Sequence, residues 1–399
     1  MKYRAKLNST AVGLVAAFVA HASFAQEVVL GVFVPTTGNW AAIGTDMKNG
    51  LELAAQGAKV KGQPVRLIVE DTAGNPQTGL KKAQKLKVDD KAVLLIGGAS
   101  SAVTLAINAQ ADRLNVPIIT TNGQAVAITG DKCSRYLFRT VPNDALAAKG
   151  TTVLMQQRKD LLAKKWFVVY HDFVYGHSNK AEFAKVPGIK IVGEAGRPLG
   201  TADWSSAISQ IQASSADGVY LALAVGDDLT AFVNQLRGFG INHSLIVPVG
   251  IPDSMLQALG KNGVGMVTGG LTASWTQENS NPQVAEFVKA YVAKYKVVPG
   301  YQAINAYAGM QLTLAALNAA SDMSTDSVIK ALESTTADTV LGKLKIRKED
   351  HQAMIGSYIA EAQALPTPKY GASVAWKTST PIGWEQIKYN PTDLGCKGL

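Results

Sequence analysis

The sequence predicts an α/β fold of two similar lobes, each built on a parallel sheet with helices on both faces. Short runs rich in Val, Ile and Leu alternate with longer amphipathic stretches, and this alternation occurs twice in tandem. Strand–helix–strand repeats of this kind favour parallel strands covered on both sides. The length of 399 residues also exceeds what one hydrophobic core usually organises, which indicates two domains.

The first set of elements lies in the N-terminal third of the chain. Its apolar runs predict strands over 27–34, 65–70, 93–96 and 116–120. The amphipathic stretches between them predict helices over 45–56, 78–89 and 102–114.

The second set follows without a Gly/Ser-rich or Pro-rich linker, so the chain is expected to cross between the lobes through short segments. Strands are predicted over 166–171, 190–194, 218–223, 245–249 and 265–269, and helices over 145–158, 203–214 and 227–238. After Gly270 the periodicity predicts helices over 281–295, 304–320 and 324–334, and then short strands and turns over 342–389.

The N-terminal segment has the pattern of a secretory signal. A basic stretch, 1–6, precedes an apolar run over 11–20 that is too short to span a bilayer. Ser23, Phe24 and Ala25 then supply the small residues of a cleavage site, so residues 1–25 are predicted to be a signal peptide. An uncleaved N-terminal anchor helix is the alternative. We therefore expect an exported chain.

The charge pattern argues against a nucleic-acid partner. The formal net charge is +9, but three of the basic residues lie in the signal segment and the rest are spread along the chain. Nucleic-acid binding usually needs a clustered basic patch or stripe.

The cysteine and histidine content limits which disulfide bonds and metal sites the chain can form. Cys133 and Cys396 either form a disulfide bond in an oxidising compartment or are two buried thiols, because spacing in sequence cannot place their α-carbons. With two cysteines and few histidines, the pattern of a zinc site is missing. No cofactor is expected.

A serine loop follows the predicted strand over 93–96. The segment from Gly98 to Ala102 differs by one residue from the G-x-S-x-G elbow of serine hydrolases, since Ala102 replaces the last glycine. His243 and His351 lie in a loop and a charged turn, which does not favour a general base. We therefore predict no catalytic residue. Ser100 or Ser101 is expected to cap the following helix, whose free amides and dipole suit a carboxylate.

Ligands of open parallel sheets bind beyond the carboxyl ends of the strands. The loops that follow the predicted strands are therefore the candidate site, and they cover 35–40, 71–74, 97–101, 121–124, 171–176, 224–228 and 250–253. Trp40, Tyr175 and Trp275 are the aromatic candidates, because such rings pair an apolar face with a polar atom.

Taken together, these segments resemble the periplasmic solute-binding proteins of ABC transporters, of the branched-chain amino acid (Leu/Ile/Val) type. The resemblance runs along nearly the whole chain after the signal segment. It is carried by the order and spacing of LGVFVPTTGNWAAIGTDMKNGLELA, VEDTAGNPQTGLKKAQKL, LLIGGASSAVTLAI, VPIITT, VVYHDFVYGHS and GTADWSSAISQIQASSADGVYLA.

The resemblance implies two Rossmann-like lobes joined by a three-crossover hinge, with a ligand cleft between them. Lobe one would comprise 26–145 plus 273–345, and lobe two 146–272 plus 346–399. It also implies a periplasmic monomer, not an enzyme, that closes on a small-molecule ligand and delivers it to a membrane permease. A periplasmic sensor that presents its ligand to a receptor is an alternative.

The resemblance also implies site residues. The family's carboxylate-binding serine loop matches Ala99, Ser100 and Ser101, with Ser101 best aligned. The head-group loop matches Asn122, Gly123 and Gln124, although the family usually has smaller residues there. The cleft tyrosine matches Tyr175.

One departure leaves the ligand open. The acidic residue that pairs with the ligand's ammonium falls at Val249, and Asp253, Asp227 or Asp228 would have to replace it. In that case the ligand is an amino acid. Otherwise it is an aromatic or aliphatic acid or amide without an α-ammonium group, held by Ser101, Asn122 and Gln124.

Overall fold

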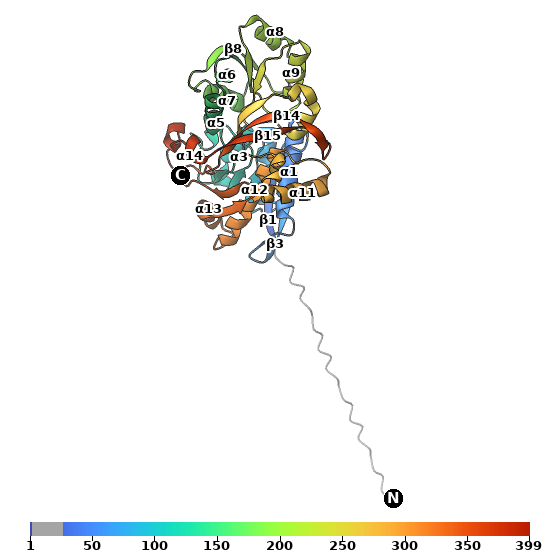
Figure 1. Cartoon of the computed structure of the whole chain (residues 1–399). Coiled ribbons are helices and arrows are strands. Elements are labelled where there is room, and N and C mark those ends of the chain that lie inside the picture. Colours follow the sequence, from blue (N-terminus) through green and yellow to red (C-terminus); the bar gives the residue numbers. More distant parts are fainter. Residues whose placement is uncertain (2–26) are drawn as a thin grey trace.

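The structure is a computed structural model that describes Met1 and residues 27–399. Apart from Met1, the predicted signal peptide lies outside the described residues. Figure 1 shows two lobes, with α6 to α9 at one end of the molecule and α12 and α13 at the other. We define lobe one as the six-stranded sheet with its helices, and lobe two as the seven-stranded sheet with its helices.

The sheet of lobe one has the strand order β2-β3-β1-β4-β5-β6. Its strands are β1 (Val28–Val34), β2 (Lys59–Val60), β3 (Gln63–Asp71), β4 (Leu94–Gly97), β5 (Ile118–Thr120) and β6 (Leu137–Arg139). All pairs are parallel except β2 with β3. Val28 lies opposite Val65, and Leu30 opposite Leu94. Since β1 is buried along its whole length, it forms the centre of this sheet.

The sheet of lobe two has the order β15-β14-β11-β10-β9-β7-β8. Its strands are β7 (Lys165–His171), β8 (Lys190–Arg197), β9 (Gly218–Ala222), β10 (Ser244–Ile246), β11 (Val267–Leu271), β14 (Ser357–Lys369) and β15 (Ala372–Ile382). The strands from β7 to β11 pair in parallel, whereas β14 and β15 are antiparallel. Both sheets are therefore mixed, with antiparallel strands at one edge.

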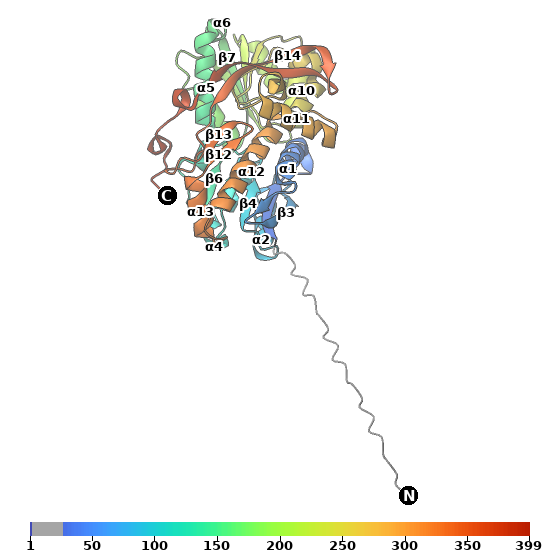
Figure 2. The ribbon, with the colours of Figure 1, turned by 60° about the horizontal axis from the view of Figure 1, so that its bottom comes forward.

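The helices of lobe one are α1 (Ala41–Ala55), α2 (Pro76–Val88), α3 (Ser101–Asn108), α4 (Ala111–Leu114), α11 (Pro282–Tyr295), α12 (Tyr301–Ala319) and α13 (Thr325–Ser334). Short 3-10 turns η1 (Gly38–Trp40) and η2 (Val126–Ile128) lie in its loops, and η4 (Trp275–Asn279) precedes α11. A hairpin of β12 (Thr336–Thr339) and β13 (Gly342–Lys345) follows α13. Helix α12 packs against α1, and both are seen beside each other in Figure 2.

The helices of lobe two are α5 (Asp144–Gln157), α6 (Lys159–Leu162), α7 (Val174–Phe183), α8 (Ser205–Ala213), α9 (Asp227–Gly238), α10 (Asp253–Leu259) and α14 (Trp384–Ile387), with turns η3 (Gly260–Gly263) and η5 (Pro391–Leu394). One hydrophobic cluster extends from β1 and α12 to β9 and β10 of this lobe. The two lobes therefore share a continuous core.

The structure confirms the predicted α/β fold and corrects parts of it. The region over 342–389 holds two long strands, β14 and β15, where short strands were expected. The predicted helix over 102–114 is two helices, α3 and α4, separated at Ala109 and Gln110. Strand β6 and helices α7 and α10 were not predicted. β6 and α10 carry too few residues to show a period, and the buried face of α7 includes Asn179 and Glu182, so it forms no apolar stripe.

The chain passes between the two sheets three times, after β6, after β11 and before β14. These passages are the three crossovers that the family resemblance implies. The exact lobe boundaries given above stay a prediction.

Cys133 and Cys396 form a disulfide bond, with their α-carbons 5.7 Å apart. The bond ties the C-terminal segment to the loop before β6. Among the described helices, none is long and apolar enough to cross a membrane.

Candidate functional site

A small cavity lies where the loops of the two lobes meet. Its volume is about 30 Å³, measured as the space open to the centres of water molecules. Lobe one contributes residues from η1, α1, α12, the start of α3 and the loops after β4 and β5. Lobe two contributes residues from the start of α7 and the loops after β7 and β9. The lining comprises Trp40, Ile43, Ala99, Ser100, Ser101, Asn122, Gln124, Phe173, Tyr175, Ala224, Val225 and Tyr301.

The turn between β4 and α3 sets up one wall of this cavity. Gly98 has a φ of 71°, and a Cβ at this position would lie 2.7 Å from Thr104 Oγ1. Glycine is therefore needed on both conformational and steric grounds. Ser100 is the N-cap of α3, and its Oγ accepts a hydrogen bond from the Val103 amide at 3.4 Å. Ser101 is thus the first residue of the helix.

Ser101 connects two loops of lobe one. Its Oγ accepts hydrogen bonds from the backbone amides of Gln124 and Ala125, each at 3.2 Å, and the side chain is buried. Because both lone pairs are engaged, the hydroxyl hydrogen remains available to a ligand. The first amides of α3 also lack intrahelical partners, and they carry the positive end of the helix dipole. This wall of the cavity therefore presents hydrogen-bond donors.

Two polar atoms of the cavity lining have no hydrogen-bond partner among the described residues. Asn122 donates from Nδ2 to the carbonyl of Ala99 at 3.1 Å, which leaves its buried Oδ1 without a donor. The buried Trp40 Nε1 has no acceptor. Buried polar groups are normally paired, so these two atoms indicate where a ligand's own polar groups belong.

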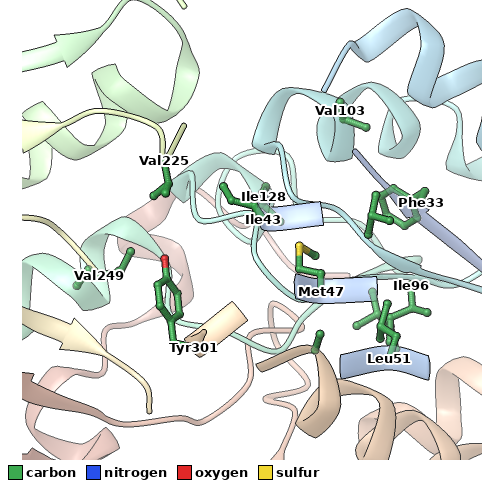
Figure 3. Packing of buried hydrophobic residues seen from close by; sticks show 14 of the residues in the cluster. Phe33, Ile43, Met47, Leu51, Ile96, Val103, Ile128, Val225, Val249 and Tyr301 are labelled. Carbon is green, nitrogen blue, oxygen red and sulfur yellow. The ribbon is translucent and has the colours of Figure 1, made fainter. Parts of the chain in front are cut away.

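Aromatic rings form another part of the cavity lining, which we call the aromatic wall: Trp40, Phe173 and Tyr175. The ring centroids of Trp40 and Phe173 are 6.1 Å apart, and those of Phe173 and Tyr175 are 6.0 Å apart. Burial, followed by the charge of Asp144, raises the pKa of Tyr175 well above its usual value, so its hydroxyl stays neutral. In Figure 3, Tyr301 extends from the start of α12 with its hydroxyl directed toward Val225.

A buried pair supports the loop of lobe two that lines the cavity. His171 Nδ1 accepts a hydrogen bond from the Ala224 amide at 2.9 Å, and Nε2 lies 2.9 Å from Asp228 Oδ2. An acceptor at Nδ1 places the ring proton on Nε2, facing the carboxylate. Burial raises the pKa of the Asp228 carboxyl, but the hydrogen bonds from His171 and the Gly200 amide outweigh this effect. The pKa therefore lies below its usual value.

The structure gathers most of the predicted site residues at one place. Trp40, Ala99, Ser100, Ser101, Asn122, Gln124 and Tyr175 all line the cavity. Gly123 lies in the same loop, where its amide donates to Thr120 Oγ1 at 2.8 Å, but it does not line the cavity.

Three predicted residues lie elsewhere. Asp227 begins α9 with an exposed side chain. Asp253 and Trp275 are buried and bonded to each other, since Trp275 Nε1 donates to Asp253 Oδ1 at 2.7 Å. Asp228, the further alternative, lies against His171. The structure therefore brings none of the predicted partners of an ammonium group to the cavity lining.

Five lining residues were not singled out from the sequence. Phe173, Ala224 and Val225 fall within loops that the strand pattern marked as candidates, so a wider selection would have found them. Ile43 and Tyr301 lie on helices, and helical periodicity alone does not separate a cavity wall from a core position.

The cavity lining is uncharged. Among the lining residues in the described chain, none is acidic or basic. Asp144 lies behind the Gln124 loop, where its amide donates to the Gln124 carbonyl at 2.9 Å. Burial raises the pKa of its carboxyl to about 8, so the group is largely neutral at physiological pH. The site therefore offers donors and aromatic surface but no fixed negative charge.

The sequence profile of the periplasmic binding protein family matches residues 27–366. The chain belongs to this family. It is 28% identical over 365 residues to the Leu/Ile/Val-binding protein homolog 8 of Brucella suis biovar 1, covering 86% of this chain and 89% of that protein. The family resemblance drawn from the sequence is confirmed.

Solved structures of solute-binding proteins share the fold. One is an ABC transporter protein from Rhodopseudomonas palustris BisB5 in complex with 3,4-dihydroxybenzoic acid, with a TM-score of 0.80 and 23% identity, covering 91% of this chain and 98% of that chain. Another is the branched-chain amino acid transporter substrate-binding protein LivJ from Streptococcus pneumoniae in complex with isoleucine. Its TM-score is 0.74 at 20% identity, and the match covers 90% of this chain and 99% of that chain. These likenesses show that the chain has the same two-lobed fold as these proteins.

Proposed function

We propose that this periplasmic binding protein carries a small carboxylic acid without a cationic amino group to an ABC importer. The observation that carries the proposal is the cavity lining, in which the start of α3 supplies donors and no lining residue is acidic. A carboxylate would be matched by these donors, whereas an ammonium group would have no charged partner there.

The carboxylate would lie at the start of α3. The hydroxyl of Ser101 is held in place by two backbone amides, which fixes its direction before a ligand arrives. Its remaining hydrogen and the free amides of the first turn form a donor set suited to an anion. Because the surrounding lobes exclude water, such hydrogen bonds are stronger than they would be at a surface.

The rest of the ligand would be planar and aromatic. Trp40, Phe173 and Tyr175 present ring surfaces to the same cavity, and rings of this kind favour stacked or edge-on contact with another ring. Trp40 Nε1 and Asn122 Oδ1 would pair with further polar groups of the ligand, such as hydroxyl groups. The 3,4-dihydroxybenzoic acid bound by the Rhodopseudomonas palustris protein has this combination of groups.

A branched-chain amino acid is the second candidate. It is favoured by Asn122 Oδ1, a buried acceptor that an ammonium group would satisfy, and by the names of the Brucella relatives. It would leave the positive charge without a carboxylate partner, because Asp253 is bonded to Trp275 and Asp227 is exposed. Burying such a charge is costly, which is why we prefer the acid without an amino group.

In the cell, the proposed protein would be exported to the periplasm by residues 1–25. Its lobes, with the boundaries given above, would close on the solute as a monomer and present the closed form to a membrane permease. Closure of this kind is a hinge motion between rigid lobes, and the three passages between the sheets would form the hinge.

Native mass spectrometry tests the proposal without a choice of ligand beforehand. We expect protein purified gently from its periplasm to carry an added mass that fits an aromatic carboxylic acid. An added mass that matches leucine, isoleucine or valine would instead establish the second candidate.

A further inference from the structure

Helix α9 of lobe two lacks a capping side chain of its own. It begins at Asp227, and its N-cap is Gly226, which has no side chain to accept a hydrogen bond. Asn39 of η1 supplies the acceptor from lobe one, since its Oδ1 accepts from the Asp227 amide at 2.8 Å. A side-chain oxygen at this place satisfies one of the free amides of a helix start. Asn39 therefore caps a helix of the other lobe.

The close approach of the two lobes here depends on glycine. A Cβ placed on Gly226 would lie 2.7 Å from Asn39 Nδ2 and 2.9 Å from Asn39 Oδ1. The backbone of Gly226 is extended, with a φ of −177°, so alanine would fit the backbone without strain. The three atoms nearest to such a Cβ all belong to Asn39, so the contact with Asn39 favours glycine at this position.

A second cap runs in the opposite direction. Turn η2 of lobe one begins at Val126, and its N-cap residue Ala125 makes no side-chain capping bond. Ser178 of α7, in lobe two, accepts from the Val126 amide through its Oγ at 3.2 Å. Each lobe therefore supplies a cap that the other lobe lacks.

Both caps adjoin the cavity without lining it. Trp40 follows Asn39, and Val225 precedes Gly226, while Tyr175 lies one helical turn before Ser178. These hydrogen bonds join the two lobes beside the cavity, so a hinge motion that separates the lobes there would break them.

We propose that Asn39 and Ser178 are positioning residues that reciprocally cap helix α9 and turn η2 across the two lobes, and that these bonds set how long the closed form lasts. The inference rests on the proposed function only in requiring that a solute binds between the lobes. Loss of one cap should speed solute release about fivefold, since a helix cap contributes about that factor to an equilibrium. The rate of association should change little, because the caps form after the solute has entered.

Distances between spin labels at Lys81→Cys on α2 and Gln210→Cys on α8, both exposed, would report closure directly. The probe is 3,4-dihydroxybenzoate, with its dissociation followed by stopped-flow fluorescence. Asn39→Ala and Ser178→Ala should each reduce the closed fraction and speed dissociation about fivefold. The matched control is Asn281→Ala, which removes the N-cap of α11 within lobe one and should lower stability without altering closure.

The double variant Asn39→Ala/Gly226→Ala distinguishes a specific effect on the interlobe cap from a general loss of stability. Gly226→Ala alone should impair closure through its clash with Asn39. In the Asn39→Ala background the same change should cost little, because the clashing atoms are gone. Equal effects of Gly226→Ala in both backgrounds would overturn the proposal, as would an unchanged dissociation rate in Asn39→Ala.

The outcome remains decisive if the chosen acid does not bind. In that case the proposed ligand class is wrong, and the distances between the two spin labels in the ligand-free protein test whether the caps stabilise the closed form. The wild type must then show a closed fraction that Asn39→Ala reduces, and the absence of any such reduction overturns the proposal.

Discussion

Trp275 donates its indole N–H to Asp253 across 2.7 Å, and both side chains are buried. Burial raises the pKa of the Asp253 carboxyl to about 8, although the bond from Trp275 opposes this shift. In the unfolded chain the same group loses its proton near pH 4. Between these values the folded state binds more protons than the unfolded state.

The free energy of unfolding should therefore fall as the pH rises from about 4 to about 8. Asp253→Asn keeps an acceptor for the indole and has no carboxyl proton to lose. The decline in its free energy of unfolding over this pH range should therefore be smaller than that of the wild type by at least about 1 kcal/mol. Urea unfolding at pH 5, 7 and 9 checks the prediction. Asp112→Asn, at an exposed position of α4, is the control. A decline in Asp253→Asn as steep as that of the wild type would refute it.

Removing the hydroxyl of Ser101 should weaken binding of an aromatic acid. Ser101→Ala deletes both a donor to the carboxylate and the acceptor for the Gln124 and Ala125 amides. A charge-assisted hydrogen bond is worth about 1.5–3 kcal/mol, so we expect at least tenfold weaker binding by calorimetry. Ser324→Ala removes the N-cap of α13 and should leave affinity unchanged. Equal affinities for Ser101→Ala and the wild type would show that this serine does not hold the ligand.

The aromatic wall should contribute separately to binding affinity. Two variants of Trp40 distinguish the contribution of its ring from that of its indole N–H. Trp40→Ala removes the ring that faces Phe173 and should weaken binding of 3,4-dihydroxybenzoate about tenfold, since aromatic pairs add about 0.5–1.5 kcal/mol beyond burial. Trp40→Phe keeps a ring and loses the unpartnered indole N–H, so a smaller loss is expected. Trp384→Ala, in α14 and outside the cavity lining, is the control. If Trp40→Ala binds as well as Trp384→Ala, the wall plays no part.

The architecture could be predicted because its signal is local. Strands such as β1 and β9 are buried on both faces and therefore appear as continuous apolar runs, and the helices between them are long enough to show a period. Strand β14 lies between β11 and the edge strand β15, and its last four residues are exposed. The sequence pattern therefore did not separate this long strand from turns.

The candidate site was predictable only in part, for a tertiary reason. The carboxyl ends of parallel strands meet at one edge, which placed Ser101, Asn122 and Tyr175 together. The same rule could not tell that Asp253 turns away to meet Trp275, 22 residues further along the chain. Tyr301 was not predicted as a lining residue, because it begins a helix and does not directly follow a strand.

The disulfide bond should contribute to stability and not to affinity. It links residues separated by 263 positions, and disulfides stabilise mainly by restricting the unfolded chain, typically by about 2–4 kcal/mol. The double variant Cys133→Ser/Cys396→Ser should therefore unfold at a lower temperature and bind its ligand as the wild type does, because neither cysteine lines the cavity. An unchanged midpoint by calorimetry would show that the bond restrains little.

A cavity whose described lining holds no acidic side chain should bind an acid without an amino group. Calorimetric titration of the wild-type protein with 3,4-dihydroxybenzoate and with L-isoleucine, under the same conditions, is the most direct test of this expectation. We predict saturable binding of the aromatic acid and at least hundredfold weaker binding of isoleucine, because its ammonium group would be buried without a charged partner. Tight binding of isoleucine with no heat from the aromatic acid would contradict the proposed ligand class.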